Sequence, residues 1–332
     1  MGRRHGLTAL ADAASSPPLR RVVVLGATGT IGRATVAALV ARGVAVTAVV
    51  RPGTVAVFDG VTVRAVALTD PDALAGVMRG AEAIVSCLAS RSGVPADAWA
   101  VDHRANATAL AAAGAAGVGH FVLLSAICVQ RPKLAFQHAK LAFEAELQAS
   151  PLRWTIVRPT AFFKSLSGQV ERVRRGQPFL VFGDGTLTAC KPISDGDLAA
   201  YLADCLDRTD RWNRILPIGG PGPAITPRNQ GEALFALLGR PARFRHVPVG
   251  LLDAIVAGLG TAGRVVPSLA AKAELARIGR YYATESMLLW DAAVGRYDAA
   301  ATPSTGRETL FDHYAALLRG DATTERGDHA VF

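Results

Sequence analysis

Short apolar runs alternate with helical patterns along the first half of the chain. The apolar runs predict strands at about 21–26, 44–50, 61–67, 83–87, 120–125 and 154–157. Apolar residues at helical spacing predict helices between them, at about 30–42, 70–79, 97–116 and 135–149. Strands that alternate with helices in this way are typical of an α/β fold with a doubly wound parallel sheet.

The first apolar run ends in three evenly spaced glycines, Gly26, Gly29 and Gly32, and a helical pattern follows. This order predicts a buried strand, a tight turn and a helix N-terminus, whose unpaired N–H groups bind phosphate. Gly26 permits the turn, Gly29 lets the backbone approach a pyrophosphate, and Gly32 lets the helix pack on the strand. We therefore predict a Rossmann dinucleotide site, with a plain glycine-rich turn as the alternative. Its candidate residues are Gly26, Thr28, Gly29, Thr30, Ile31 and Gly32.

The residue after the second predicted strand indicates which dinucleotide binds. An acidic residue there selects NAD through the ribose 2′-hydroxyl. This chain instead has Arg51, nineteen residues after Gly32. Since a guanidinium pairs with a 2′-phosphate, the sequence predicts NADPH as the cofactor, with a solvated surface arginine as the alternative. Leu88, Ala89 and Pro159, which follow later predicted strands, are further candidates for contact with NADPH.

Glycine and proline become frequent after Pro159, and the regular alternation of strands and helices ends. Helices are still predicted, at 164–175, 195–207, 228–238 and 250–259. We expect an NADP-binding Rossmann domain over residues 21–159 and a smaller C-terminal substrate lobe, packed on the sheet edge, over residues 160–318. Residues 1–20 and 319–332 are expected to be flexible tails.

Composition argues against several other classes of protein. The chain has 332 residues, 50% of them hydrophobic, and a net charge of +9. Its basic residues are scattered, without long runs or aromatic interleaving, so we expect no nucleic-acid partner. The four cysteines lack close pairs, so we expect free thiols and no metal site. Because glycines interrupt the uncharged run 105–130, we expect no transmembrane span and a cytoplasmic protein.

The order of glycine turn, Ser125 at the end of a strand and Lys140 on a helix resembles the short-chain dehydrogenase/reductase superfamily. In its carbonyl reductases, a tyrosine four residues before the lysine donates a proton. Here that position is Phe136, and a phenyl ring cannot donate a proton. The resemblance therefore favours an NADPH-dependent reductase that does not act on a simple ketone. Lys140 can hold the nicotinamide ribose, with an exposed helix lysine as the alternative.

A hydride enzyme without that tyrosine can still reduce an activated double bond. Hydride adds to one carbon, and the negative charge spreads into a conjugated system, so that no strong acid is needed at first. The proton then comes from water or from a weak donor such as Tyr281 or Tyr282. We predict Lys140, Ser125 and Tyr281 as the catalytic residues.

Several longer motifs resemble the NADPH-dependent divinyl (proto)chlorophyllide 8-vinyl reductases of (bacterio)chlorophyll synthesis. They lie at residues 85–91, 124–130, 158–166, 183–185, 189–194, 216–222 and 278–283. The resemblance runs from about residue 20 to about residue 318, and Phe136 is also what this family has. It implies that the C8 vinyl group of divinyl chlorophyllide a, or of divinyl protochlorophyllide, is reduced to ethyl with NADPH. That vinyl group is conjugated with the macrocycle, which can spread a carbanion.

The implied substrate is a flat chlorin that carries magnesium, and it needs a wide apolar cleft. Lys164 and Lys191 are candidates to bind the propionate, and the candidate walls of the cleft are Phe162, Phe163, Phe179, Tyr281 and Tyr282. Ordinary core or surface positions are the alternative for each. For the apolar segment 249–259, a core helix is preferred over a cleft lid or a membrane contact. The resemblance also suggests peripheral contact with the photosynthetic membrane and with other pigment-synthesis enzymes.

Two other functions stay open. One is a different NADPH-dependent alkene or imine reductase on the same fold. The other is a non-catalytic NADP-binding sensor or pigment-assembly factor, which the loss of the superfamily tyrosine allows. Lys140 and the full set of motifs favour an enzyme over this second alternative.

Overall fold

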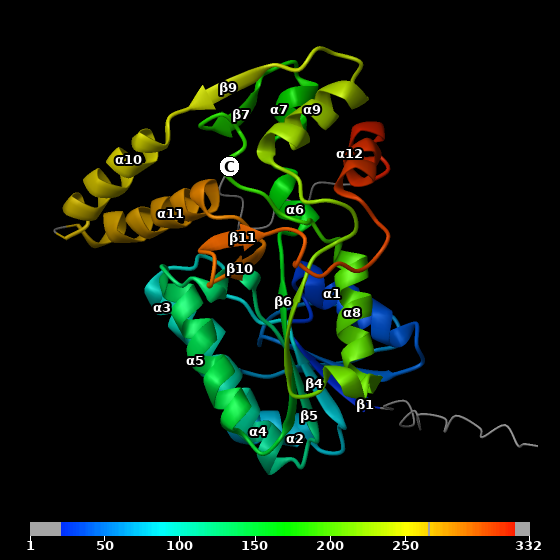
Figure 1. Cartoon of the computed structure of the whole chain (residues 1–332). Helices are drawn as coiled ribbons and strands as arrows, with labels where there is room; N and C mark the ends of the chain where they lie inside the picture. Colours follow the sequence, from blue (N-terminus) through cyan, green and yellow to red (C-terminus); the bar gives the residue numbers. More distant parts are fainter. Residues whose placement is uncertain (1–20, 265, 323–332) are drawn as a thin grey trace, which may run out of the picture.

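The computed structural model describes residues 21–264 and 266–322, and within them seven parallel strands form one sheet (Figure 1). The strand order, β3-β2-β1-β4-β5-β6-β8, reverses direction between β1 and β4, so the predicted doubly wound Rossmann sheet is confirmed. The expected tail 1–20 and residues 323–332 lie outside the described part of the chain. The strands are β1 (Arg21–Leu25), β2 (Ala45–Val50), β3 (Thr62–Ala65), β4 (Ala83–Ser86), β5 (His120–Leu124), β6 (Arg153–Pro159) and β8 (Arg214–Ile218).

Helices cover both faces of this sheet (Figure 1). Successive residues of β1 point to opposite faces, so Val22 and Val24 belong to one buried cluster and Val23 and Leu25 to the other. Because both faces are covered, the strand is apolar throughout. The first layer is α1 (Thr30–Val40) and α8 (Asp195–Asp207), and the second is α2 (Pro71–Met78), α4 (Asn106–Ala115) and α5 (Ala135–Ala149).

The helix predicted at 97–116 is divided into three parts. α3 (Pro95–Ala98) continues into a π-helical segment, η1 (Trp99–Ala105), before α4 begins. A π-helical turn is wider than an α-helical turn and therefore shifts the side chains around the helix axis. In this segment it places the carboxylate of Asp102 in the interior of the protein.

Most of the second half of the chain lies beyond the carboxyl ends of the strands, whereas α8 and β8 join the sheet layers (Figure 1). An apolar cluster that includes Phe179, Phe235 and Tyr314 holds this region together. The division of the chain near residue 160 stays a prediction. The elements here are α6 (Phe163–Leu166), α7 (Val170–Arg174), β7 (Phe179–Phe182), α9 (Pro227–Leu237), β9 (Phe244–Val247), β10 (Leu289–Asp291), β11 (Arg296–Asp298) and α12 (Leu310–Arg319).

α10 (Val249–Ala262) and α11 (Pro267–Thr284) form a helical hairpin at one end of the molecule (Figure 1). None of the residues of α10 is buried, and Leu251 and Ile255 are exposed. The interpretation of 249–259 as a core helix is therefore wrong, because α10 packs mainly on α11 and is open on its other side. No helix among the described residues is long and apolar enough to cross a membrane.

Backbone contacts fix the glycine turn between β1 and α1. Gly26 has a φ of +72°, and a Cβ added to it would lie 2.7 Å from the carbonyl oxygen of Cys87, just after β4. A Cβ on Gly32 would lie 2.1 Å from the Gly26 carbonyl oxygen. A side chain at either position would therefore push the turn away from β4 or move α1 off the strand.

We expect Gly32→Ala to lower the free energy of unfolding by about 1–3 kcal/mol, because the added methyl group overlaps the Gly26 carbonyl and must displace α1. Gly114→Ala is the matched control, since Gly114 is also helical and an added Cβ there has no atom within 4 Å. Alanine at that position should raise stability by up to ~1 kcal/mol. Urea unfolding of both variants checks this, and equal effects would contradict it.

Candidate active site

The carboxyl ends of β1 and β4 meet beside the N-terminus of α1. Gly29 precedes the first helical residue, and no described side chain caps this end of the helix. Thr28 and Gly29 are exposed, whereas Ile31 is buried. Leu88 and Ala89 follow Cys87 just after the end of β4, and Ala89 is exposed. Backbone N–H groups at an uncapped helix N-terminus can bind a phosphate group.

Lys164 reaches this turn from α6. Its Nζ donates to Oγ1 of Thr30, the first residue of α1, over 2.9 Å. Asp195 at the start of α8 lies nearby: desolvation raises the pKa of its carboxyl, and the charge of Lys164 opposes that rise. Oδ1 of Asp195 is buried and has no hydrogen-bond partner among the described residues. The structure thus places an ammonium group beside the glycine turn, where the sequence predicted a substrate contact.

Two exposed arginines belong to the same end of the sheet. Arg51 directly follows β2, which pairs with β1. Arg33 lies in the first turn of α1, and its Nε donates to the Thr28 carbonyl over 3.2 Å. Its guanidinium is 5.2 Å from the centre of the Phe58 ring. The sequence prediction named only Arg51, although the position of Arg33 directly after the last glycine was an available signal.

The helical lysine predicted from the sequence forms a buried ion pair. Nζ of Lys140 is 2.9 Å from Oδ1 of Asp102, and the two side chains are only 11% and 1% exposed. The backbone N–H of Ser90 donates to the same oxygen over 3.3 Å. Oδ2 of Asp102 is buried without a hydrogen-bond partner in the described part of the chain. Asp102 was not predicted, because no local sequence pattern marks the π-helical turn that carries it.

Ser125 belongs to a second buried network. Its hydroxyl donates to Oε1 of Glu144 over 2.5 Å, and the guanidinium of Arg158 pairs with the same carboxylate. Glu144 lies on α5 and is fully buried, and Arg158 belongs to β6. The Ser125 proton therefore points into the interface between helix and sheet, which favours a structural role for this residue.

Two adjacent tyrosines of α11 differ in their surroundings. Tyr281 is 3% exposed, and its hydroxyl donates to the Cys128 carbonyl over 3.1 Å. Tyr282 is 41% exposed, and its ring packs edge-on against Tyr281 at 5.7 Å. Desolvation, followed by interactions with Cys128 and Tyr281, holds the pKa of the Tyr282 hydroxyl well above its usual value. Phe136 is buried in the same cluster as Tyr281.

The remaining candidates are divided between the core and partly open positions. Phe163 is buried in the apolar cluster around α7 and α9, and Phe162 is half-buried. Nζ of Lys191 donates to the Thr302 carbonyl over 2.7 Å. Pro159 ends β6 and is buried. Contacts within the protein thus account for Phe163 and Lys191, and a contact of any of these residues with a ligand stays a prediction.

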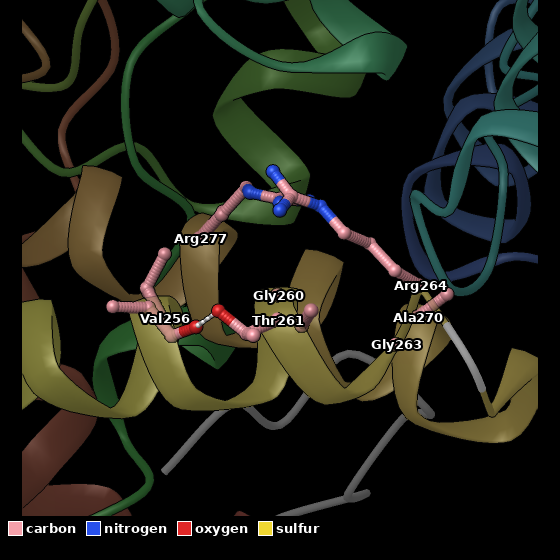
Figure 2. A pocket seen from close by; sticks show the side chains of 9 residues that line it. Val256, Gly260, Thr261, Gly263, Arg264, Ala270 and Arg277 are labelled. Carbon is pink, nitrogen blue, oxygen red and sulfur yellow. Dashed lines mark hydrogen bonds between the residues drawn. The ribbon is translucent and has the colours of Figure 1, made fainter.

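A separate open pocket of about 490 Å³ lies between α10 and α11 (Figure 2). Small and apolar residues line most of it. Figure 2 shows the guanidinium groups of Arg264 and Arg277 extended toward each other across it. Arg277 pairs with Glu274 of its own helix. Two cations therefore converge beside an exposed apolar helix.

The potential metal ligands and the cysteines of the described residues bear on the predicted absence of a metal site. No group of three or more His, Cys, Asp and Glu residues in 21–264 and 266–322 is arranged to hold a metal ion. The four cysteines are free thiols. Burial raises the pKa of the Cys87 thiol to about 12, so this thiol next to the glycine turn stays protonated.

The site fits a dinucleotide, since it combines glycines that admit no side chain, an uncapped helix N-terminus and nearby cations. A family model described as NAD(P)H-binding matches residues 26–209. The fold is similar to that of an NADPH-dependent quinone oxidoreductase from Escherichia coli complexed with NADPH, with a TM-score of 0.64 and 19% identity over 89% of this chain and 99% of that chain. The chain is therefore an NAD(P)H-binding protein of the Rossmann type.

Closer relatives define the family. The chain is 49% identical to the divinyl chlorophyllide a 8-vinyl-reductase of Zea mays, over 94% of this chain and 82% of that protein. It is 45% identical to the enzyme of the same name from Arabidopsis thaliana, over 96% and 84%. The chain belongs to the divinyl chlorophyllide a 8-vinyl-reductase family, and the resemblance stated from the sequence motifs is confirmed.

Proposed function

We propose that this protein reduces the C8 vinyl group of divinyl chlorophyllide a to ethyl with NADPH, in (bacterio)chlorophyll biosynthesis. The observation that carries the proposal is the identity of 45% and 49% with 8-vinyl-reductases over nearly the whole chain. The site agrees with it, because Phe136 occupies the position of the acid that carbonyl reduction needs, while Lys140 is retained beside it.

Bound NADPH supplies the hydride, and the residues of the chain bind and orient the reactants. The glycine turn presents backbone N–H groups to the pyrophosphate, and Arg51, together with Arg33 at the same end of the sheet, binds the 2′-phosphate. Lys140 binds the nicotinamide ribose. Its pairing with Asp102 limits the movement of a flexible side chain, so that its ammonium protons keep one direction.

Lys164 belongs to the cofactor site in this proposal. The pyrophosphate of a Rossmann dinucleotide lies at the N-terminus of the first helix, and Lys164 donates to the first residue of that helix. An ammonium group at this place adds a charge-assisted contact with phosphate. Asp195, whose buried Oδ1 has no hydrogen-bond partner in the described part of the chain, lies near enough for its charge to attract the Lys164 ammonium.

The chlorin is proposed to bind between the glycine turn and α11. Leu275 and Tyr282 are exposed and lie seven residues apart, so they share one face of α11. With the half-buried Phe162, they provide apolar surface for a flat macrocycle. A role of Lys191 at the propionate and contacts with other pigment-synthesis enzymes stay predictions.

Purified protein with NADPH and divinyl chlorophyllide a is expected to shift the Soret band to shorter wavelength, toward the monovinyl spectrum. NADPH should be consumed in equal amount, because each vinyl group accepts one hydride. A parallel reaction with divinyl protochlorophyllide determines the preference. A different alkene reductase would consume NADPH only with other alkenes, and a pigment-holding factor would bind both ligands without turnover. Either result would contradict the proposal.

Arg51→Ala and Lys164→Met should weaken cofactor binding in different ways. Arg51→Ala is expected to raise the Kd for NADPH on the order of tenfold and to leave the Kd for NADH unchanged, because only NADPH has a 2′-phosphate. Lys164→Met is expected to raise both Kd values by a similar factor, because both dinucleotides have a pyrophosphate. Calorimetric titration of each variant with each dinucleotide measures these changes.

Lys272→Met is the matched control, since Lys272 is an exposed lysine of α11, and both affinities should stay as in the wild type. Equal losses for NADPH and NADH in Arg51→Ala would refute the 2′-phosphate assignment. Unchanged Kd values for both dinucleotides in Lys164→Met would contradict its place in the cofactor site and favour the sequence prediction of a substrate contact.

Peripheral contact with an anionic membrane surface is proposed for the hairpin of α10 and α11. α10 exposes Leu251 and Ile255 and buries none of its residues. Arg264 and Arg277 converge beside it (Figure 2), and guanidinium groups bind lipid phosphate well. An apolar helix surface flanked by cations is the pattern by which interfacial helices bind anionic membranes.

The protein is expected to co-sediment with vesicles of phosphatidylglycerol and phosphatidylcholine, and less with phosphatidylcholine alone, because the arginines attract anionic headgroups. The double variant Leu251→Asp/Ile255→Asp should bind several-fold less. Val55→Asp is the matched control, because Val55 is an exposed apolar residue in the loop after β2. Wild-type sedimentation of the double variant would show that the hairpin is not the contact.

A further inference from the structure

Reduction of the vinyl group requires a proton as well as a hydride, and any assignment of the proton donor rests on the proposed function. Four groups that can lose a proton lie around the retained lysine or were predicted to act with it: Ser125, Cys128, Tyr281 and Tyr282.

Three of these groups are engaged or buried. Ser125 donates to Glu144, which also pairs with Arg158. Tyr281 is buried and donates to the carbonyl of Cys128. The Cys128 thiol is itself buried, and desolvation raises its pKa. None of the three presents an available proton to a ligand outside the core.

Tyr282 differs from these three because the residue is 41% exposed, although its hydroxyl is desolvated next to Cys128. Its ring stands edge-on to Tyr281, and it interacts through its side chain with Cys128. The positive charge of Lys140, which pairs with Asp102, opposes the rise in the pKa of the Cys128 thiol. Tyr282 is thus partly open to solvent, and its hydroxyl lies next to Cys128, within electrostatic reach of the buried pair of Lys140 and Asp102.

Because Phe136 cannot donate a proton, the acid must come from another element, and α11 lies close to Phe136. Phe136 and Ile278 both line the space at Gly93, where an added Cβ would lie 2.9 Å from Ile278 and 3.7 Å from Phe136. Ile278 is four residues before Tyr282, so the two lie on neighbouring turns of the same side of α11. α11 therefore brings a phenol close to the helix position from which the superfamily tyrosine is missing.

We infer that Tyr282 is the general acid that protonates the reduced vinyl group, in the role that Phe136 cannot fill. The hydride brings two electrons to the terminal vinyl carbon, and the negative charge is shared between the inner carbon and the macrocycle. The O–H bond of Tyr282 then breaks as a C–H bond forms at the inner carbon. The phenolate that remains takes a proton from water, so each turnover consumes one proton from solvent.

The electrostatic surroundings agree with a phenol that stays protonated until it is needed. Desolvation is the largest cause that raises the pKa of Tyr282, followed by Cys128, Tyr281 and Asp102. The hydroxyl is therefore neutral at ordinary pH. A carbanion is a much stronger base than a phenolate, so the transfer is favourable even from a weak acid.

Tyr282→Phe is expected to lower kcat by about 10²–10⁴-fold, the usual contribution of a positioned acid, with the Kd for NADPH unchanged. A second readout is the position of deuterium in the product formed in D₂O. The wild-type enzyme should give a methylene carbon that carries one deuterium in a single configuration, because a fixed group delivers it to one face. In Tyr282→Phe, water delivers it, and both configurations should appear.

Tyr281→Phe is the comparison, because it removes the adjacent hydroxyl, and it should keep the single configuration. Tyr282→His tests the same role with a different acid. Its kcat should exceed that of Tyr282→Phe at low pH and should fall as pH rises through about 6.5, where imidazole loses its proton. A histidine limited to packing would show no such fall.

The result that overturns the inference is a Tyr282→Phe enzyme that keeps both the wild-type kcat and a single configuration. A loss of NADPH binding equal to the loss of turnover would assign Tyr282 to binding instead. Failure of the wild-type enzyme to reduce the vinyl group refutes the proposed function itself and is thereby distinct from both results.

Discussion

The site depends on the close approach of backbone segments at the glycine turn. Cβ atoms added to Gly26 and Gly32 would lie 2.7 and 2.1 Å from the carbonyl oxygens of Cys87 and Gly26, so neither position can carry a side chain without displacement. These contacts bring the end of β1, the end of β4 and the start of α1 into one surface. In the proposed cofactor site, backbone geometry therefore determines where phosphate groups can bind, and the charged side chains are placed relative to it.

Two buried carboxylates near this surface, Glu144 and Asp102, differ in how completely they are hydrogen-bonded. Burial of a charge is costly unless it is paired and hydrogen-bonded. Glu144 meets this condition through Ser125 and through Nε and Nη2 of Arg158. Asp102 meets it at one oxygen only, and the ammonium of its partner Lys140 has protons beyond the one directed at Asp102. Unused hydrogen-bonding capacity in a buried pair is typical of a place where a ligand completes the network.

Local sequence patterns predicted the alternation of strands and helices, and the helix predicted at 195–207 has the same bounds as α8. They did not predict the π-helical turn at Asp102, since its residues would fit an ordinary helix equally well. They also could not tell that α10 is open on one side, because an apolar helix has the same periodicity whether it is covered or not. The contact of Lys164 with Thr30 joins residues 134 positions apart, and only the folded chain shows it.

Local sequence patterns also could not show which tyrosine supplies the acid that is missing at Phe136. Spacing along α5 shows that an acid is absent at Phe136, but a replacement from another helix leaves no trace in that spacing. Tyr281 and Tyr282 are adjacent and chemically identical, and a difference of about 100° around the helix axis separates them. That rotation buries Tyr281 against the Cys128 carbonyl and leaves Tyr282 exposed. In the role inferred for Tyr282, α11 supplies the hydroxyl that α5 lacks at Phe136, and any further hydroxyl buried there would need its own partner.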